Sequence, residues 1–295
     1  MEAEEKLLQG KLVASQNADG GWGYGKGSSW TEPTALALLS LTNFPETRER
    51  AFQWLRKAQR SDGGWPPQPS VGESTWVTSL GILATPQNEL KSPASKAALE
   101  WLAKQAKPPS SAFERFLLHL RGLPIPIEAG IGESWFPRTA AWVYPTAISI
   151  LALSYAADIT GQKSYRDLAQ KGKLYILSRR CPDGGWNHGG SRYLSENAAS
   201  YPEITGLALL ALTGLSKQDL APSFECAQKF LSSPESLEGL SWLQMGLVSQ
   251  GCEFSYEQTS SPCRSTRDIA LRLLALAAIQ GRSKRSAAHS LLRES

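Results

Sequence analysis

Three near-copies of the tetrapeptide Asp-Gly-Gly-Trp decide the fold: "NADGGWGYG" (Asn17–Gly25), "SDGGW" (Ser61–Trp65) and "CPDGGWNHGG" (Cys181–Gly190). The first two tryptophans are 43 residues apart, and the third follows after 121 more, close to three further periods of about 40 residues. Each copy follows a stretch with the periodicity of a helix. A phrase that recurs at a fixed period indicates a repeat architecture, so we interpret it as a corner that is built once per repeat.

The residue types of this phrase suit a structural corner. Asp bonds to nearby backbone and Gly adopts positive φ, and together they make a tight turn. The Trp ring can then fit between adjacent helices, where its burial contributes about 2–3 kcal/mol. A polar residue stands six positions before each Trp and is expected to hydrogen-bond the backbone at the junction: Gln16, Gln59 or Arg180. A catalytic role for the three aspartates is the alternative.

A second phrase alternates with the first, and its copies are apolar on nearly all sides and rich in Ala, Gly and Ser. The copies are "WTEPTALALLSL" (Trp30–Leu41), "WVTSLGILA" (Trp76–Ala84), "WVYPTAISILALSY" (Trp142–Tyr155), "YPEITGLALLALTG" (Tyr201–Gly214) and "RDIALRLLALAAI" (Arg267–Ile279). Such helices are buried all round, and their small residues let neighbours approach closely. Between them lie half-exposed helical stretches such as "AALEWLAKQ" (Ala97–Gln105) and "ECAQKFLSS" (Glu225–Ser233).

This alternation predicts an all-α protein in the form of a closed ring. In a ring, outer helices cover the outside of the apolar inner helices, which face a lumen on their other side. We therefore expect a single α/α toroid of five to six helix pairs over residues 1–282, with strands nearly absent. The register of the helices between residues 108 and 133 stays open.

The amino-acid composition is that of an ordinary globular chain of 295 residues, with 41% apolar and 20% charged residues. The net charge of +4 is mild and predicts no nucleic-acid partner, and the basic residues 283–295 are expected to form a solvated tail. No apolar run approaches the roughly 18–20 residues of a membrane span, and the acidic start is unlike a secretory signal. The four cysteines lack CxxC spacing, so we expect reduced thiols and a cytoplasmic location.

The phrases "QNADGGW", "QRSDGGW" and "RRCPDGGW" resemble the QW motif of the prenyltransferase and squalene-hopene cyclase repeat superfamily. The resemblance covers most of Leu7–Leu215 and fades afterwards. It implies an α/α toroid but no single reaction, because that fold hosts metal-dependent prenyl transfer, metal-free cationic cyclisation and non-enzymatic roles.

Two motifs found in members of this superfamily distinguish between these reactions. Prenyltransferase β-subunits bind zinc through an Asp, a Cys two residues later and a distant His. The sequence has no Asp-x-Cys, and His119, His188 and His289 show no zinc-like spacing, so we expect no metal or other cofactor. Class II terpene cyclases use an Asp-x-Asp-Asp-Thr-Ala motif, which is also missing. The phrase "WTEPTAL" keeps its Thr-Ala and places Glu32 where the catalytic acid would stand.

The residues in register with Glu32 open the other inner helices, so we expect them to crowd one rim of the lumen: Trp76, Tyr144, Glu203 and Arg267. Glu32 and Glu203 are the candidate catalytic residues, because burial among aromatic side chains would raise the pKa of a carboxyl, while Arg267 would oppose that effect. The candidate substrate-binding residues are Trp30, Trp76, Trp142, Tyr144, Tyr201 and Arg267, whose aromatic members could stabilise cations. Alternatively, Glu32 and Glu203 only cap their helices.

The first hypothesis is therefore a terpene-cyclase-like enzyme that protonates an isoprenoid in the lumen without a metal. The missing Asp neighbours and the length, sufficient for one toroid, count against full cyclase activity. A toroid that binds an isoprenoid or lipid without catalysis, a glycan-acting enzyme that uses the two carboxylates as acid and base, and a protein scaffold are the alternatives. The expected ligand is a hydrophobic small molecule; peripheral membrane contact, a homo-oligomer and a partner subunit all stay open.

Overall fold

A computed structural model of the chain describes residues 1–106, 120, 130–189, 192–193, 196–252, 254 and 263–281. Six of its helices are inner helices: α2 (Thr31–Ser40), α4 (Val77–Ala84), α7 (Val143–Thr160), α9 (Pro202–Ala211), α11 (Leu237–Ser249) and α12 (Thr266–Ile279). Five are outer helices: α1 (Glu2–Ala14), α3 (Pro45–Ala58), α5 (Pro93–Gln105), α8 (Lys163–Ser178) and α10 (Ala221–Leu231). The strands of the described residues form two short hairpins, β1 (Glu133–Ser134) with β2 (Ala141–Trp142) and β3 (Arg192–Tyr193) with β4 (Glu196–Asn197).

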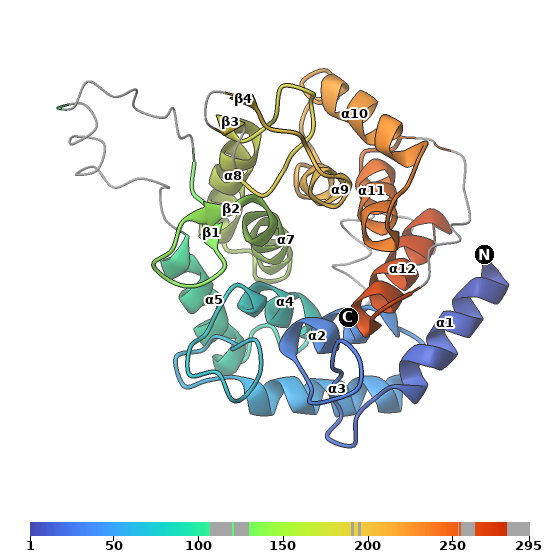
Figure 1. Cartoon of the computed structure of the whole chain (residues 1–295). Coiled ribbons are helices and arrows are strands. Elements are labelled where there is room, and N and C mark those ends of the chain that lie inside the picture. The colour runs from blue at the N-terminus through green and yellow to red at the C-terminus, as the bar shows by residue number, and fades with distance from the viewer. Residues whose placement is uncertain are drawn as a thin grey trace.

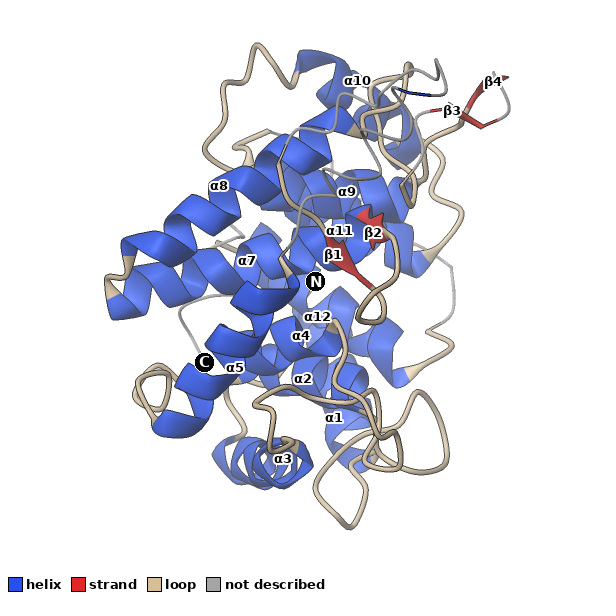
Figure 2. Cartoon of the chain, turned by 90° about the vertical axis from the view of Figure 1, so that its left-hand side faces the viewer, coloured by secondary structure: helices blue, strands red, loops and turns tan. Residues whose placement is uncertain are grey.

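The inner helices form a closed ring (Figure 1). Each packs against the next in the order α2, α4, α7, α9, α11 and α12, and α12 returns to α2. The outer helices cover this wall, with α3 on α2, α5 on α4, α8 on α7, α10 on α9 and α1 on α12. The long loops gather at one end of the ring, beside β1 and β2 (Figure 2). The predicted α/α toroid and the near absence of strands are confirmed.

The inner wall is tight because small residues face each other across it. Gly206 of α9 and Gly246 of α11 meet backbone to backbone, and a Cβ added to Gly206 would lie 2.3 Å from the backbone nitrogen of Leu243. The sequence analysis did not identify α11 as an inner helix, because no close copy of the inner phrase begins it. Its apolar residues and its two glycines are the signal that could have identified it.

The Asp-Gly-Gly-Trp corners are structural, as predicted. In each corner the indole Nε1 donates to a carbonyl near the end of the preceding outer helix, and the backbone N–H of the Trp donates to a Thr hydroxyl of the next inner helix. The pairs are Trp22 with Leu12 and Thr34, Trp65 with Leu55 and Thr78, and Trp186 with Ile176 and Thr205, at 2.6–3.0 Å. These bonds tie each corner to the helix before it and to the inner helix after it.

The other residues of the corner also act as expected. Asp62 Oδ1 accepts from the backbone N–H of Gly64 at 3.0 Å, which holds the turn. Gln59, before the corner, donates to the backbone carbonyls of Gly63 at 2.7 Å and Ala94 at 3.0 Å, and so ties the turn to the next outer helix. Gly63 has a φ of +92°, and a Cβ there would lie 2.5 Å from the backbone of that helix, so glycine is required.

Helix α7 is, by length and composition, apolar enough to cross a membrane, which the sequence analysis did not anticipate. It has 18 residues, and 78% of them are buried inside the protein. Its apolar side chains are therefore explained by their packing within the inner wall of the ring. The cytoplasmic location stays a prediction.

Some expectations fall on parts of the chain outside the described residues. These are the basic tail at residues 283–295, the side chains of His119 and His289, and most of the segment 108–133 whose register stayed open.

Candidate active site

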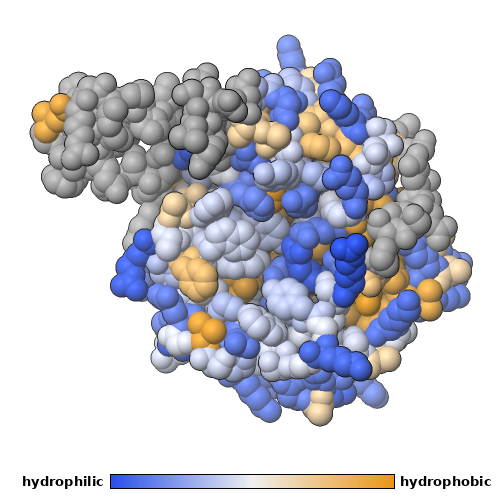
Figure 3. Space-filling model, in the orientation of Figure 1, coloured by the Kyte–Doolittle hydropathy of each residue, from blue (hydrophilic) through white to orange (hydrophobic). Residues whose placement is uncertain are grey.

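All six inner helices place the second residue of their first turn, or the residue that caps it, at the same end of the ring. These rim residues are Glu32, Trp76, Tyr144, Glu203, Glu238 and Arg267. The sequence register identified five of them and missed Glu238, which belongs to α11. Because the positive end of every helix dipole lies at its N-terminus, this rim favours carboxylates, and three of the six residues are Glu. The centre of this face is hydrophilic (Figure 3).

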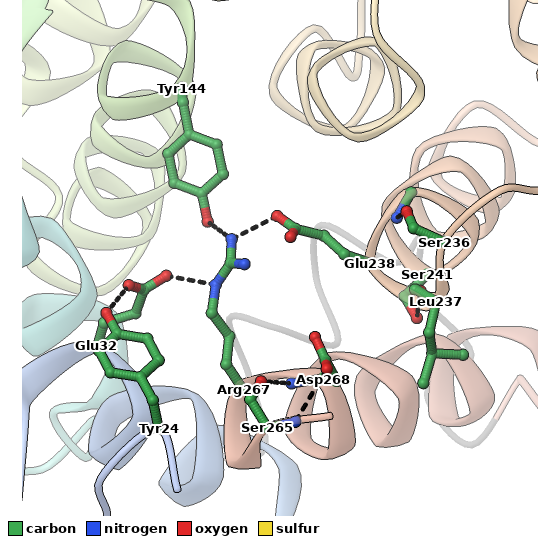
Figure 4. Close-up of polar contacts among 11 residues, drawn as sticks. Tyr24, Glu32, Tyr144, Ser236, Leu237, Glu238, Ser241, Ser265, Arg267 and Asp268 are labelled. Carbon is green, nitrogen blue, oxygen red and sulfur yellow. Dashed lines mark hydrogen bonds and ion pairs between the residues drawn. The ribbon is translucent and has the colours of Figure 1, made fainter. Parts of the chain in front are cut away.

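Arg267 is the centre of the rim (Figure 4). Its Nε is 2.7 Å from Glu32 Oε1, and its Nη2 is 2.5 Å from Glu238 Oε1. The same Nη2 donates to the hydroxyl of Tyr144 at 3.1 Å. Burial alone would lower the pKa of Arg267, but Tyr144 and the two carboxylates raise it well above its ordinary value. The guanidinium is thus a fixed positive charge that joins residues from four inner helices.

Two tyrosine hydroxyls complete this network. Tyr24, from the loop after the first corner, donates to Glu32 Oε2. Burial raises the pKa of Tyr24, and the negative charge of Glu32 raises it further. Burial also raises the pKa of Tyr144. Both hydroxyls therefore stay protonated and act as hydrogen-bond donors or acceptors, not as bases.

The surroundings of Glu32 differ from the apolar lumen that the sequence analysis expected. Glu32 is 7% exposed, but Arg267 and Tyr24 both hold its carboxylate. The ion pair with Arg267 and the hydrogen bond from Tyr24 occupy the two oxygens of this carboxylate. Glu32 is therefore not placed as a free proton donor.

Glu203 differs from the other two rim carboxyls. Within the described residues it forms no ion pair, and it is half-buried at the first turn of α9. Burial raises the pKa of Glu203; the hydrogen bond from its own backbone N–H lowers it, and the nearby charge of Glu238 raises it again. Glu203 is thus the rim carboxyl best placed to carry a proton and to meet a ligand from solvent.

A buried aromatic cluster fills the lumen beside Arg267. The ring of Tyr144 stacks on Trp135 at 5.4 Å and meets Trp76 edge-on at 5.4 Å and Trp242 edge-on at 6.2 Å. Trp76 and Tyr144 were predicted, whereas Trp135 and Trp242 were missed because they lie outside the phrases that set the register. Trp30 lies apart from this cluster and packs edge-on against Tyr24 at 5.6 Å.

The other two predicted aromatics form an exposed group that we call the rim platform, consisting of Trp142, His188 and Tyr201. His188 contacts Trp142 at 6.3 Å and Tyr201 at 5.4 Å between ring centroids. Trp142 is 38% exposed and Tyr201 is 44% exposed. The third corner holds the platform in place, because Tyr201 N donates to Trp186 O and Val143 N donates to His188 O. Tyr201 stands two residues before Glu203 and is exposed, whereas His188 is half-buried.

The sequence patterns did not indicate a further carboxyl, that of Glu133. The backbone N–H of Glu133 donates to Thr146 Oγ1 at 2.8 Å, the same bond that Trp22 and Trp65 make to their threonines. Glu133 therefore occupies the Trp position of a corner that has lost its motif. Its side chain is 2% exposed, and among the described residues its Oε2 has no hydrogen-bond partner. Burial raises the pKa of Glu133 to about 8, so its carboxyl is protonated at neutral pH.

No protein-family model and no curated protein matches the sequence. Solved structures do match. Endoglucanase Cel10, a family 8 glycosyl hydrolase from Klebsiella pneumoniae, has a TM-score of 0.57 at 16% identity, covering 94% of this chain and all (100%) of that one. The chain has the α/α-toroid fold of these structures. An alpha-amylase from Clostridium perfringens (TM-score 0.58, 11% identity, 92% and 96% covered) and type II terpene cyclase MstE from Scytonema (TM-score 0.54, 14% identity, 97% and 80% covered) share it.

This likeness confirms the fold that the QW resemblance implied. It does not choose between the reactions, because glycoside hydrolases and a terpene cyclase share one toroid. Within the described residues, no group of three or more His, Cys, Asp and Glu side chains could hold a metal ion. The choice of function therefore depends on the rim itself.

Proposed function

We propose that the rim is the active site of an enzyme that acts on a carbohydrate. Glu203 is the general acid, and Glu238, which forms an ion pair with Arg267, is the carboxylate that works with it. The observation that carries the proposal is the contrast between these two groups: burial raises the pKa of Glu203, whereas Glu238 is ion-paired with Arg267. A pair of carboxyls in different surroundings, one to donate a proton and one to act on the other side of the bond, is the usual requirement for hydrolysis of a glycosidic bond.

In this mechanism Glu203 gives its proton to the glycosidic oxygen as the bond to the sugar carbon breaks. The carboxylate of Glu238 takes a proton from the water that attacks that carbon. Arg267 orients Glu238 through its Nη2, and the same Nη2 donates to the hydroxyl of Tyr144, which helps to fix the guanidinium. The electrostatic coupling between Glu203 and Glu238 supports this pairing, because it requires the two groups to lie near one another.

The rim platform supports a carbohydrate as the substrate. A sugar ring has a hydroxylated edge and a face of C–H groups, so it binds where exposed aromatic faces lie next to polar side chains. Trp142 and Tyr201 provide exposed rings, and His188 and Glu203 provide polar groups beside them. The toroid neighbours include an endoglucanase, an alpha-amylase and an alpha-mannanase from Bacteroides thetaiotaomicron, so we take glucan, starch and mannan as the first substrates to test.

The terpene-cyclase-like reaction is the second candidate, and the buried aromatic cluster favours it. Faces of Trp76, Trp135 and Trp242 around Tyr144 are the kind of lining that stabilises carbocations. The rim opposes it, since Glu32 is ion-paired with Arg267, and Arg267 is also ion-paired with Glu238 (Figure 4). A hydrophobic ligand, membrane contact and a partner subunit stay predictions of that alternative.

The test compares product release from β-1,4-glucan, starch and α-mannan with turnover of farnesyl and geranylgeranyl substrates. We expect reducing ends from one of the glycans and no isoprenoid product. Glu203→Gln should lower kcat by a factor of about 100 or more while leaving KM nearly unchanged. The matched control is Glu235→Gln, an exposed residue three positions before Glu238, which should retain full activity.

The pH profile gives a second readout. Activity should fall as the pH rises through the raised pKa of Glu203, because only its protonated form is the acid. Full turnover by Glu203→Gln, or cyclised isoprenoid as the only product of the wild type, would refute the proposal.

A further inference from the structure

The third Asp-Gly-Gly-Trp corner has a cavity that lies outside the rim. Its volume is about 480 Å³. Residues that line it include Asp183, Ser200, Pro222, Cys226, Lys229 and Phe230. The size is that of an ordinary small-molecule site. A difference in sequence between this corner and the other two explains the cavity.

One contact recurs at each corner, and it aligns the sequences of the three repeats with one another. In each, the positive-φ glycine of the corner lies against one residue of the next outer helix: Gly20 against Arg50, Gly63 against Ala97, and Gly184 against Pro222. Four residues further along each helix, one turn away, stand Trp54, Trp101 and Cys226 respectively. The third repeat therefore has a cysteine where the first two have an indole.

The first repeat shows what the indole does at this position. Trp54 is 6% exposed, and its Nε1 donates to Asp19 Oδ2 at 3.0 Å. Trp101 of the second repeat is similarly buried, at 7% exposed. The space beneath these corners is thus filled by a bicyclic aromatic ring, and in the first repeat its N–H ends on the corner carboxylate.

Cys226 cannot fill the same space, since its side chain is far smaller than an indole. Its Sγ lies 3.4 Å from Ser200 Oγ, and that hydroxyl donates to Asp183 Oδ2 at 2.8 Å. Asp183 otherwise accepts from the backbone N–H groups of Gly185 and Ser200. A carboxylate has about four acceptor positions, so Asp183 can accept one more hydrogen bond. The result is a preformed cavity with a thiol and an anionic acceptor in its lining.

We propose that this cavity binds a small, planar, bicyclic aromatic molecule with an N–H donor, of the size and chemistry of indole. The ligand occupies the place that Trp54 and Trp101 occupy in their repeats and donates its N–H to Asp183. The ring lies beside Cys226 and Phe230. This site is independent of the rim and of the function proposed for it.

The experiment titrates the full chain with indole by protein-observed NMR or calorimetry, with indene as the matched probe that lacks the N–H. We expect saturable binding of one indole and about tenfold weaker binding of indene, because a hydrogen bond to a carboxylate is lost. Indole should also slow the alkylation of Cys226 by a small maleimide and leave Cys263 unaffected. Absence of saturable binding, or equal affinity for indole and indene, would overturn the proposal.

Two variants locate the site. Cys226→Trp restores the side chain of the other repeats, so it should raise the melting temperature and abolish indole binding. Trp54→Cys opens the equivalent space in the first repeat, so it should raise the stoichiometry from one indole to two and regain part of its lost melting temperature when indole is added. Undiminished binding by folded Cys226→Trp would refute the site. If that variant does not fold, the alkylation rate of Cys226 in the wild type tests the site instead. A slower rate in the presence of indole supports the site, and an unchanged rate refutes it.

Discussion

Glu133 offers a sharp test of the electrostatics, because the structure buries an acid there without a partner. In the folded protein the pKa of Glu133 is about 8, against an ordinary value of 4.5, and burial is the cause. Between these two pH values the folded chain holds a proton that the unfolded chain has released. The free energy of unfolding must therefore fall as the pH rises through this window.

The size of the effect follows from the shift. One pKa unit corresponds to about 1.4 kcal/mol, so the 2.5 units between pH 4.5 and pH 7 cost roughly 3 kcal/mol. Glu133→Gln keeps the shape of the protonated acid and cannot ionise. We expect this variant to match the wild type near pH 4 and to exceed it by about 3 kcal/mol at pH 7, which raises the melting temperature by about 6 °C.

The assay is urea denaturation of both proteins at half-unit steps from pH 4 to pH 8, followed by circular dichroism. The difference in free energy between variant and wild type should grow with pH. Glu46→Gln, at an exposed position in the first turn of α3, is the matched control and should show no such growth. Parallel curves for Glu133→Gln and the wild type would show that Glu133 is ionised in the folded protein, and the reasoning from burial would fail.

Three further substitutions test the rim and the ring. Arg267→Met leaves two carboxylates without their cation, so we expect a loss of about 2–4 kcal/mol in denaturation experiments; an unchanged free energy of unfolding would contradict the ion pairs. Thr78→Val removes the acceptor of the Trp65 backbone N–H, at 2.9 Å, and should cost about 1–3 kcal/mol; an unchanged melting temperature would argue against the corner. Gly206→Ala puts a methyl group 2.3 Å from backbone and should cost more than 3 kcal/mol, or prevent folding; wild-type stability would refute the close approach.

The fold was predictable because the corner and the inner phrase are both local. Asp62, Gly63 and Trp65 are adjacent in sequence, and their spacing alone indicates a repeated turn with a wedged ring. Helix α11 was missed because no close copy of the inner phrase begins it, and Glu238 was missed with it. Glu133 was missed for a related reason: it stands in place of the tryptophan that would have made its corner visible.

The chemistry of the site was less predictable than its location. Register alone placed Glu32, Tyr144 and Arg267 at one rim, and the structure brings these three together. Their polar contacts join residues up to 235 positions apart, which no local pattern encodes. Glu32 was expected to lie in apolar surroundings, whereas Arg267 and Tyr24 both hold its carboxylate.

The closure of the ring has a consequence for synthesis of the protein. Helix α1 packs against α12, where Arg272, fully buried at 0% exposure, binds Glu4 at 2.8 Å, and α12 also seals the wall against α2. During synthesis α1 and α2 leave the ribosome before α12, so the ring cannot close until α12 has been made. Until then, the apolar surfaces that α12 covers on α1 and α2 are exposed. Chaperones that bind such apolar surfaces should associate with the nascent chain until α12 emerges. A circular permutant that joins α12 directly to α1 and starts at another loop should shorten that wait.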